Sequence, residues 1–173
     1  MIQNIKIYPV GLGSKNAKIP FFKPPESNLG SGSFLAQFDS KNQPSEQLQI
    51  VLGDEALSNV ASVNLIKIDV EGYEKEVLEG LKRTLAKYRP VVGCELIINP
   101  AESFGFKSKE ELQKAFPENY RIVSFDMTNF DLYTGFYQLV ELDQELRFDR
   151  AAFYEIVAYP AEKEGQIPRR GPR

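Results

Sequence analysis

The chain has 173 residues, of which 42% are hydrophobic and 26% charged, an ordinary composition for one globular domain with a core. The formal net charge of -3 gives no electrostatic case for binding nucleic acid or an anionic membrane surface. Histidine is absent and Cys94 is the single cysteine, which excludes histidine-based catalysis, an internal disulfide framework and a multi-thiolate zinc site.

The sequence carries no membrane or export signal. No apolar run approaches the roughly 20 residues that a transmembrane helix needs. The first residues also lack the basic and apolar regions of a signal peptide. We therefore expect a cytoplasmic location.

The first part of the chain combines apolar segments with turn formers. Asn4–Val10 (NIKIYPV) is rich in β-branched and aromatic residues and predicts a strand, which Gly11–Ser14 ends. Pro24–Ser33 (PPESNLGSGS) consists of turn formers. It is either a flexible linker or a loop over a site, in which Ser31, Ser33 and free backbone N–H groups would contact an anion or a polar ligand.

The next segments lead to a central strand. Gln47–Leu52 predicts a strand, and Asp54 is a candidate N-cap of a short helical segment. Val63–Ile68 is nearly continuous in apolar residues and predicts a strand that is covered on both faces. Lys67 is the exception, and its side chain either snorkels to water or pairs with a nearby carboxylate.

A helix and a parallel strand are predicted to follow this central strand. Apolar residues at four-residue spacing predict one long amphipathic helix over Glu71–Lys87. Val91–Ile98 predicts the next buried strand, in which Cys94 is a small core residue. A strand–helix–strand crossover of this kind makes the two strands parallel.

The remaining chain predicts one more helix, three strands and a tail. Ser108–Phe116 predicts a helix because Ser108 and Glu111 form a capping-box pattern. The predicted strands are Tyr120–Asp126, Phe136–Val140 and Phe153–Tyr159. We expect one domain over residues 1–160 and a disordered tail over Ala161–Arg173, which is polar and rich in proline and glycine.

Three carboxylates are predicted to meet at one edge of the sheet. Asp69 and Glu71 follow the central strand, and Glu95 lies near the end of the next one. Together they would suit a ligand amine or hydroxyl, or a hard cation such as magnesium. The alternative is structural, with Asp69 capping the helix and Glu71 favouring its positive end. Tyr73, near the same edge, suits packing.

The run Ile66–Leu78 (IKIDVEGYEKEVL), followed by Gly80, closely resembles the signature of FkbM family methyltransferases. The resemblance extends from Asn4 to Ile98. Three further segments carry it: Asn4–Gly13, similar to the family's third strand and its glycine turn; Asn28–Ser33, similar to a loop with asparagine, glycine and paired serines; and Pro90–Glu95, similar to a proline-led strand that ends in glutamate.

The resemblance implies an α/β fold with a partial Rossmann-like, doubly wound sheet, and S-adenosyl-L-methionine as cofactor for methyl transfer to a hydroxyl group. Carried over, Gly11 and Leu12 would border the adenine ring, and Asp69 the methionine moiety or the substrate. Because the chain has no histidine, Asp69 or Glu71 would be the catalytic base or would orient the hydroxyl. The candidate substrate-binding residues are Ser31, Ser33 and Glu95.

The chain departs from the family at its start. In the family, a glycine-rich strand–turn–helix holds the cofactor's carboxylate, and an acid that ends the second strand binds the ribose. Residues 1–4 supply neither, so we expect a sheet that begins at the third strand and has an open edge. A partial gene or misplaced start codon, a pseudo-enzyme, and a half that another chain completes are the three explanations.

Three functional hypotheses follow. The first is the C-terminal portion of an O-methyltransferase with impaired activity, acting on a sugar, lipid, polyketide or small-metabolite hydroxyl. The second is a non-catalytic interaction module that buries its open sheet edge in a homo-oligomer or against a partner chain. The third is a different α/β enzyme that uses Asp69, Glu71 and Glu95 on a divalent metal.

Overall fold

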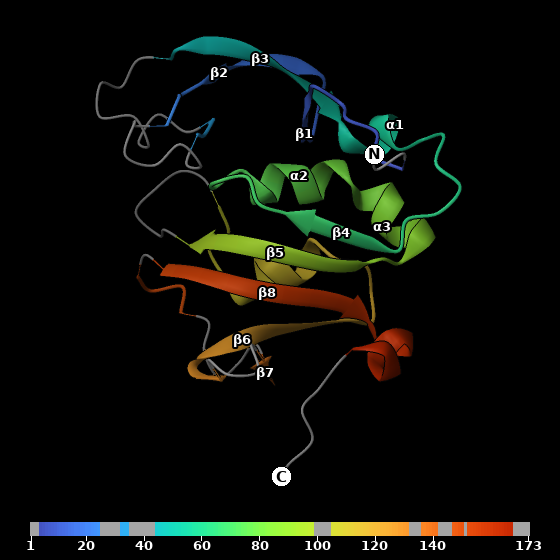
Figure 1. Ribbon diagram of the computed structural model, residues 1–173, viewed down its shortest axis with the longest axis vertical. Coiled ribbons are helices and arrows are strands. Elements are labelled where there is room, and N and C mark those ends of the chain that lie inside the picture. Colours follow the sequence, from blue (N-terminus) through green and yellow to red (C-terminus); the bar gives the residue numbers. More distant parts are fainter. Residues whose placement is uncertain are drawn as a thin grey trace.

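The structure is a computed structural model that describes residues 4–24, 32–34, 44–98, 105–131, 136–141, 147–150 and 152–167. Within these ranges the chain forms a five-stranded sheet and a three-stranded sheet. Each sheet contains both parallel and antiparallel strand pairs. The three-stranded sheet lies at the top of Figure 1, and α2 (Glu74–Gly80) lies between it and the strands β4 (Leu65–Ile68) and β5 (Val91–Ile98).

The five-stranded sheet has the order β4-β5-β8-β6-β7. Its strands are β4 (Leu65–Ile68), β5 (Val91–Ile98), β8 (Ala152–Pro160), β6 (Tyr120–Asp131) and β7 (Phe136–Glu141). β4 and β5 are parallel, which confirms the predicted crossover, and the other neighbours are antiparallel. All five strands were predicted from the sequence within a few residues.

The three-stranded sheet has the order β1-β3-β2, with β1 (Gly11–Gly13), β3 (Glu46–Leu52) and β2 (Ala17–Phe21). β3 confirms the strand predicted at Gln47–Leu52. The strand predicted at Asn4–Val10 is wrong, since pairing begins only at Gly11. No strand among the described residues pairs with residues 5–9, and Ile7 is 83% exposed. Without a neighbour, a segment of high β-propensity has no backbone ladder to join.

Two helices replace the single helix predicted over Glu71–Lys87. α2 (Glu74–Gly80) and α3 (Lys82–Tyr88) are separated at Leu81, where φ is -107° and ψ is 9°. Gly80 lies so close to β1 that an ideal Cβ there would be 1.9 Å from the carbonyl oxygen of Gly13. Glycine also has a low helix propensity. The helix therefore breaks where it packs on the small sheet.

The core lies on one face of the five-stranded sheet. α2, α3 and α4 (Lys109–Lys114) pack their apolar residues there, with Leu78, Leu85 and Leu112 fully buried. On the opposite face of β4, Leu65 is 69% exposed. The prediction that this strand is covered on both faces is therefore wrong for the described residues. Its burial alternates along the strand, as expected for a sheet with one covered face.

The later helices bear on two predictions. At α4 the Ser108 hydroxyl accepts a hydrogen bond from the Glu111 N–H at 3.2 Å, which confirms the predicted N-cap. The structure differs from the predicted disordered tail over the tail's first part, which forms the 3-10 helix η2 (Ala161–Gln166). Lys163 Nζ holds η2 by donating to the Arg89 carbonyl at 2.6 Å. Residues 168–173 lie outside the described ranges.

None of the helices in the described ranges is long and apolar enough to span a bilayer. The longest have seven residues, α2 and α3. A bilayer-spanning helix needs about 20 apolar residues.

Candidate functional site

The chain leaves β4 through a tight turn that carries the predicted acids. The Tyr73 N–H donates to the Val70 carbonyl at 3.3 Å, which closes a four-residue turn. Its two central residues both have positive φ, 50° at Glu71 and 96° at Gly72, as in a type I′ turn. The glycine takes this conformation freely, whereas the glutamate adopts it at a cost of roughly 1 kcal/mol.

The central peptide of this turn is held at both ends. The Ser33 hydroxyl donates to the Glu71 carbonyl at 2.8 Å. The Gly72 N–H donates to Glu74 Oε1 at 2.7 Å. Ser33 and Glu74 are each 1% exposed; the hydrogen bond to Glu74 is buried, and the one from Ser33 is partly buried. The strained conformation of Glu71 is therefore supported from two separate parts of the chain.

Ser33 reaches the turn because its own segment is fixed to the small sheet. Its backbone N–H and carbonyl pair with those of Phe22 at 3.1 and 2.8 Å. The ring of Phe34 lies 5.5 Å from that of Phe21 and 5.1 Å from that of Tyr73. The structure thus places the Ser33 hydroxyl, predicted as substrate-binding, on the turn. Ser31, predicted beside it, lies outside the described residues.

The predicted acids Asp69, Glu71 and Glu95 come together, as expected for neighbouring parallel strands. Burial raises the pKa of Glu95, and the charges of Asp69, Glu155 and Glu71 raise it further. Burial and the charge of Asp69 likewise raise the pKa of Glu71. The acids therefore lie close enough for their charges to interact, an arrangement that suits a cationic or hydroxyl-bearing ligand.

Lys67 is the cation that faces this edge. Its ammonium lies 3.8 Å from a carboxylate oxygen of Asp69 and 3.5 Å from one of Glu155. This confirms the predicted pairing with a carboxylate. Glu155 was not predicted, because its place depends on the antiparallel pairing of β8 with β5, where it lies opposite Glu95. The sequence gives no signal for that register.

Asp69 does not cap the helix. The residue that precedes α2 is Tyr73, and no side chain caps this helix by a hydrogen bond. The structural alternative for Asp69 is therefore wrong. Its side chain is 52% exposed and carries only the long ion pair to Lys67 among the interactions found in the described ranges. An exposed carboxylate at the end of a parallel strand is available to a ligand.

Glu74 is a site residue that the sequence analysis missed. Its Oε2 is buried and has no hydrogen-bond partner among the described residues. Burial raises the pKa of Glu74 to about 7, the Gly72 N–H opposes that shift, and the charge of Glu71 adds to it. One signal was present: Glu74 lies four residues before Leu78, on the apolar stripe of the helix.

Two cavities border the loop between β3 and β4. The first has a volume of about 280 Å³ and mostly apolar walls, formed by Tyr8, Val10, Leu12, Ala56 and Leu57. Leu12, predicted beside adenine, thus lines a cavity. Gly11 instead packs on β3, since an ideal Cβ there would lie 2.4 Å from Ile50 Cδ1. Neither Asp69 nor Glu71 lines this cavity.

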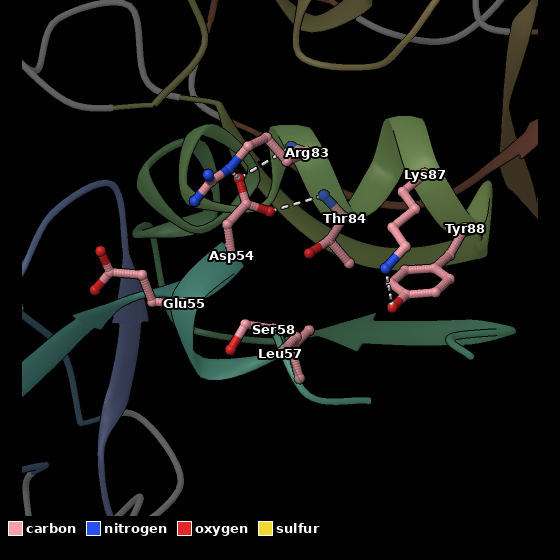
Figure 2. A pocket seen from close by; sticks show the side chains of 8 residues that line it. All are labelled: Asp54, Glu55, Leu57, Ser58, Arg83, Thr84, Lys87 and Tyr88. Atoms are coloured by element: carbon pink, nitrogen blue, oxygen red, sulfur yellow. Dashed lines mark hydrogen bonds and ion pairs between the residues drawn. The ribbon is translucent and has the colours of Figure 1, made fainter. Parts of the chain in front are cut away.

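The second cavity, also about 280 Å³, lies between the segment after β3 and one side of α3 (Figure 2). Here Asp54 accepts hydrogen bonds from the backbone N–H groups of Arg83 at 3.0 Å and Thr84 at 2.7 Å. The prediction that Asp54 caps its own segment is wrong, because α1 (Gly53–Ala56) has no side-chain cap. Asp54 caps α3 instead.

Most polar side chains that line this second cavity already have a hydrogen-bond or ion-pair partner in the described residues. Arg83 Nε lies 3.3 Å from the Asp54 carboxylate, and Lys87 Nζ donates to the Tyr88 hydroxyl at 2.8 Å (Figure 2). The Glu55 carboxylate turns away and accepts from Asn16 Nδ2 at 2.8 Å. These contacts serve packing and capping.

The described residues include no group of three or more histidine, cysteine, aspartate or glutamate side chains placed to hold a metal ion. The magnesium hypothesis for Asp69, Glu71 and Glu95 therefore has no geometric support.

Comparison with known families gave one match: the model described as the methyltransferase FkbM domain matches residues 1–154. The matched range contains β4, the turn after it, α2, α3 and β5. Comparisons with curated proteins and with solved structures gave no significant match.

Proposed function

Because the chain belongs to the FkbM methyltransferase domain family, we propose that it serves S-adenosyl-L-methionine-dependent methyl transfer to a hydroxyl group. The observation that carries the proposal is the turn after β4. It holds Asp69 and Glu71 at the end of a parallel strand, beside Glu95. This is the edge at which open α/β sheets bind their ligands.

The described residues fit one side of this cofactor. The apolar cavity that Leu12 lines is large enough for part of a flat purine ring. The acidic edge suits a positively charged sulfonium group. The 173 residues contain no glycine-rich strand–turn–helix for the cofactor's carboxylate. We propose that such a unit completes the site, and that these residues alone bind the cofactor weakly.

The chemistry asked of the chain is modest. S-adenosyl-L-methionine, when bound, supplies an activated methyl group. The chain must orient a hydroxyl oxygen and accept its proton. Glu71 is suited to accept the proton, since burial and the charge of Asp69 raise its pKa. Asp69, the more exposed acid, would orient the hydroxyl and favour positive charge nearby.

A cofactor titration followed by NMR on the full 173-residue chain tests the proposal. We expect a dissociation constant of about 1 mM or weaker, with shifts at Leu12 and over Asp69–Gly72. Asp69→Asn should reduce these shifts, and Glu79→Gln, on the exposed part of α2, should not. Absence of shifts at both places would contradict the cofactor assignment. Micromolar affinity would contradict the need for a completing unit.

A second function has one observation in its favour. β4 pairs only with β5 among the described strands, and Leu65 on it is 69% exposed. An open, partly apolar edge suits strand addition by a second chain. In that case the protein is an interaction module, and sedimentation should find an oligomer that Leu65→Lys weakens. A monomer at all concentrations would rule this function out.

A further inference from the structure

The hydrogen bonds at the turn after β4 converge on one peptide group. The Glu71 carbonyl and the Gly72 N–H belong to the same peptide unit. Ser33 binds its oxygen, and Glu74 binds its N–H. Ser33 precedes Glu71 by 38 residues, and Glu74 follows Gly72 by two. A peptide held at both ends cannot rotate unless both hydrogen bonds break.

The turn needs such support. A glutamate at a φ of 50° is in a left-handed backbone conformation, which is unfavourable for an L-residue with a Cβ. The two hydrogen bonds oppose a change out of this conformation. The bond to Glu74 is buried and the bond from Ser33 is partly buried, and each is worth more there than at the surface. The direction in which the Asp69 and Glu71 side chains leave the strand end depends on this backbone.

We propose that Ser33 and Glu74 are a pair of positioning residues that clamp the Glu71–Gly72 peptide and so fix the direction of the acids at the end of β4. That these acids serve methyl transfer rests on the proposed function. The clamp itself is a property of the folded chain and is measurable without cofactor, so the two proposals fail separately.

The surroundings of Glu74 make its ionisation a reporter of the clamp. The titratable groups that face it within the described ranges are Glu71, from the turn, and Cys94, from β5. Burial raises the pKa of the Cys94 thiol, so this group stays neutral. Because the Gly72 N–H donates to Glu74 Oε1, its amide shift should titrate with a midpoint of about 7, the pKa of Glu74.

Amide hydrogen exchange of Gly72 in the full chain is the first test. Loss of one clamping bond in Ser33→Ala or Glu74→Ala should speed exchange about tenfold. Glu74→Gln keeps an oxygen acceptor and should restore slow exchange. The matched controls are Ser45→Ala, which removes a 3.0 Å hydroxyl bond to the Phe21 carbonyl, and Glu79→Ala on the exposed part of α2. Both should leave Gly72 unchanged.

The amide titration is the second test, and it uses only variants that keep a polar side chain at position 74. The Gly72 shift should titrate near pH 7 in the wild-type chain and should not in Glu74→Gln. Unchanged Gly72 exchange in Ser33→Ala, or a Gly72 titration that persists in Glu74→Gln, would overturn the clamp. A failure of cofactor binding with both tests positive would overturn only the proposed function.

Discussion

Carboxylates meet the starts of the two consecutive helices α2 and α3, yet their pKa values move in opposite directions. Asp54 at α3 is 7% exposed in its side chain and receives two backbone N–H groups and the Arg83 guanidinium (Figure 2). Burial alone would raise its pKa, but hydrogen bonds from Thr84 and Arg83 lower it. At α2, burial raises the pKa of Glu74 to about 7, and hydrogen bonds from backbone N–H groups, including that of Gly72, offset this rise only in part.

The difference shows that burial alone does not decide the charge of an acid at a helix start. Asp54 has enough donors to remain ionised, so it is a permanent cap. At Glu74 the backbone donors do not offset burial, and Oε2 has no hydrogen-bond partner among the described residues, so its charged and neutral forms are close in free energy near neutral pH. We therefore expect the start of α2 to change its charge near neutral pH.

The largest expected effect is the pH dependence of stability that Glu74 causes. Because its folded-state pKa is raised from 4.5 to about 7, its stabilising effect is fully present below pH 4.5 and is lost as the pH rises through 7. The loss is on the order of 3 kcal/mol. Urea unfolding of the wild-type chain at values from about pH 5 to about pH 8 should show this decline in the free energy of unfolding. Glu74→Gln should flatten the decline.

The raised pKa of Glu74 is tested by the slope of the free energy of unfolding against pH, and not by the stability at one pH. A glutamine at this position places an NH₂ group where Oε2 had no partner, which has its own cost in free energy. Glu79→Gln, a substitution of an exposed glutamate on the same helix, is the matched control and should leave the slope as in wild type. An equal slope in Glu74→Gln and wild type would contradict the raised pKa.

The second effect, of about 2 kcal/mol, is expected at Asp54. Asp54→Ala leaves the N–H groups of Arg83 and Thr84 without their acceptor and so destabilises α3. The lowered pKa gives the opposite sign from Glu74: the contribution is present above pH 3.8 and is lost as the pH falls. Thermal unfolding at pH 7 and pH 3 should show a smaller difference between variant and wild type at the lower pH.

Glu55→Ala is the control for Asp54, since it removes the neighbouring carboxylate. The Glu55 carboxylate accepts a hydrogen bond from Asn16 at an exposed position and points away from the start of α3 (Figure 2). Its loss should change stability by less than about 0.5 kcal/mol. A similar loss of stability in Glu55→Ala and Asp54→Ala would show that the acidic character of the segment, and not the cap on α3, stabilises the chain.

The sequence predicted the centre of the fold because local signals there agree with the tertiary structure. The apolar runs at Val63–Ile68 and Val91–Ile98 and the crossover between them required the parallel pair β4–β5. Since parallel strands end at one edge, the meeting of Asp69 with Glu95 followed from that pairing. The Ser108 cap was predicted because its signal spans only four residues.

Features that depend on distant contacts were missed. The break at Leu81 arises where Gly80 meets β1, and the capping of α3 by Asp54 joins residues that are 29 and 30 apart. Ser33 was predicted to contact a polar ligand because it lies in a glycine-serine loop. Its hydrogen bond to the Glu71 carbonyl, 38 residues away, was not predicted. Polar residues that hold a strained turn resemble polar residues that bind a ligand.

The smallest expected effect concerns Glu71 itself. Asparagine tolerates a left-handed backbone better than glutamate does. Glu71→Asn should therefore stabilise the chain by up to about 1 kcal/mol in urea unfolding. Glu118→Asn changes an exposed glutamate outside the turn and is the matched control. A destabilised Glu71→Asn chain would mean that the glutamate side chain contributes more than its backbone strain costs.

Glu71→Asn also tests whether the turn before α2 and the cap of α3 are independent of each other. If strain at Glu71 is what the clamp opposes, Ser33→Ala should cost less free energy in the Glu71→Asn background than in wild type, whereas Asp54→Ala should cost the same in both. This double-mutant cycle needs no cofactor and no activity. Equal costs of Ser33→Ala in the two backgrounds would show that Ser33 stabilises its own loop and not the turn.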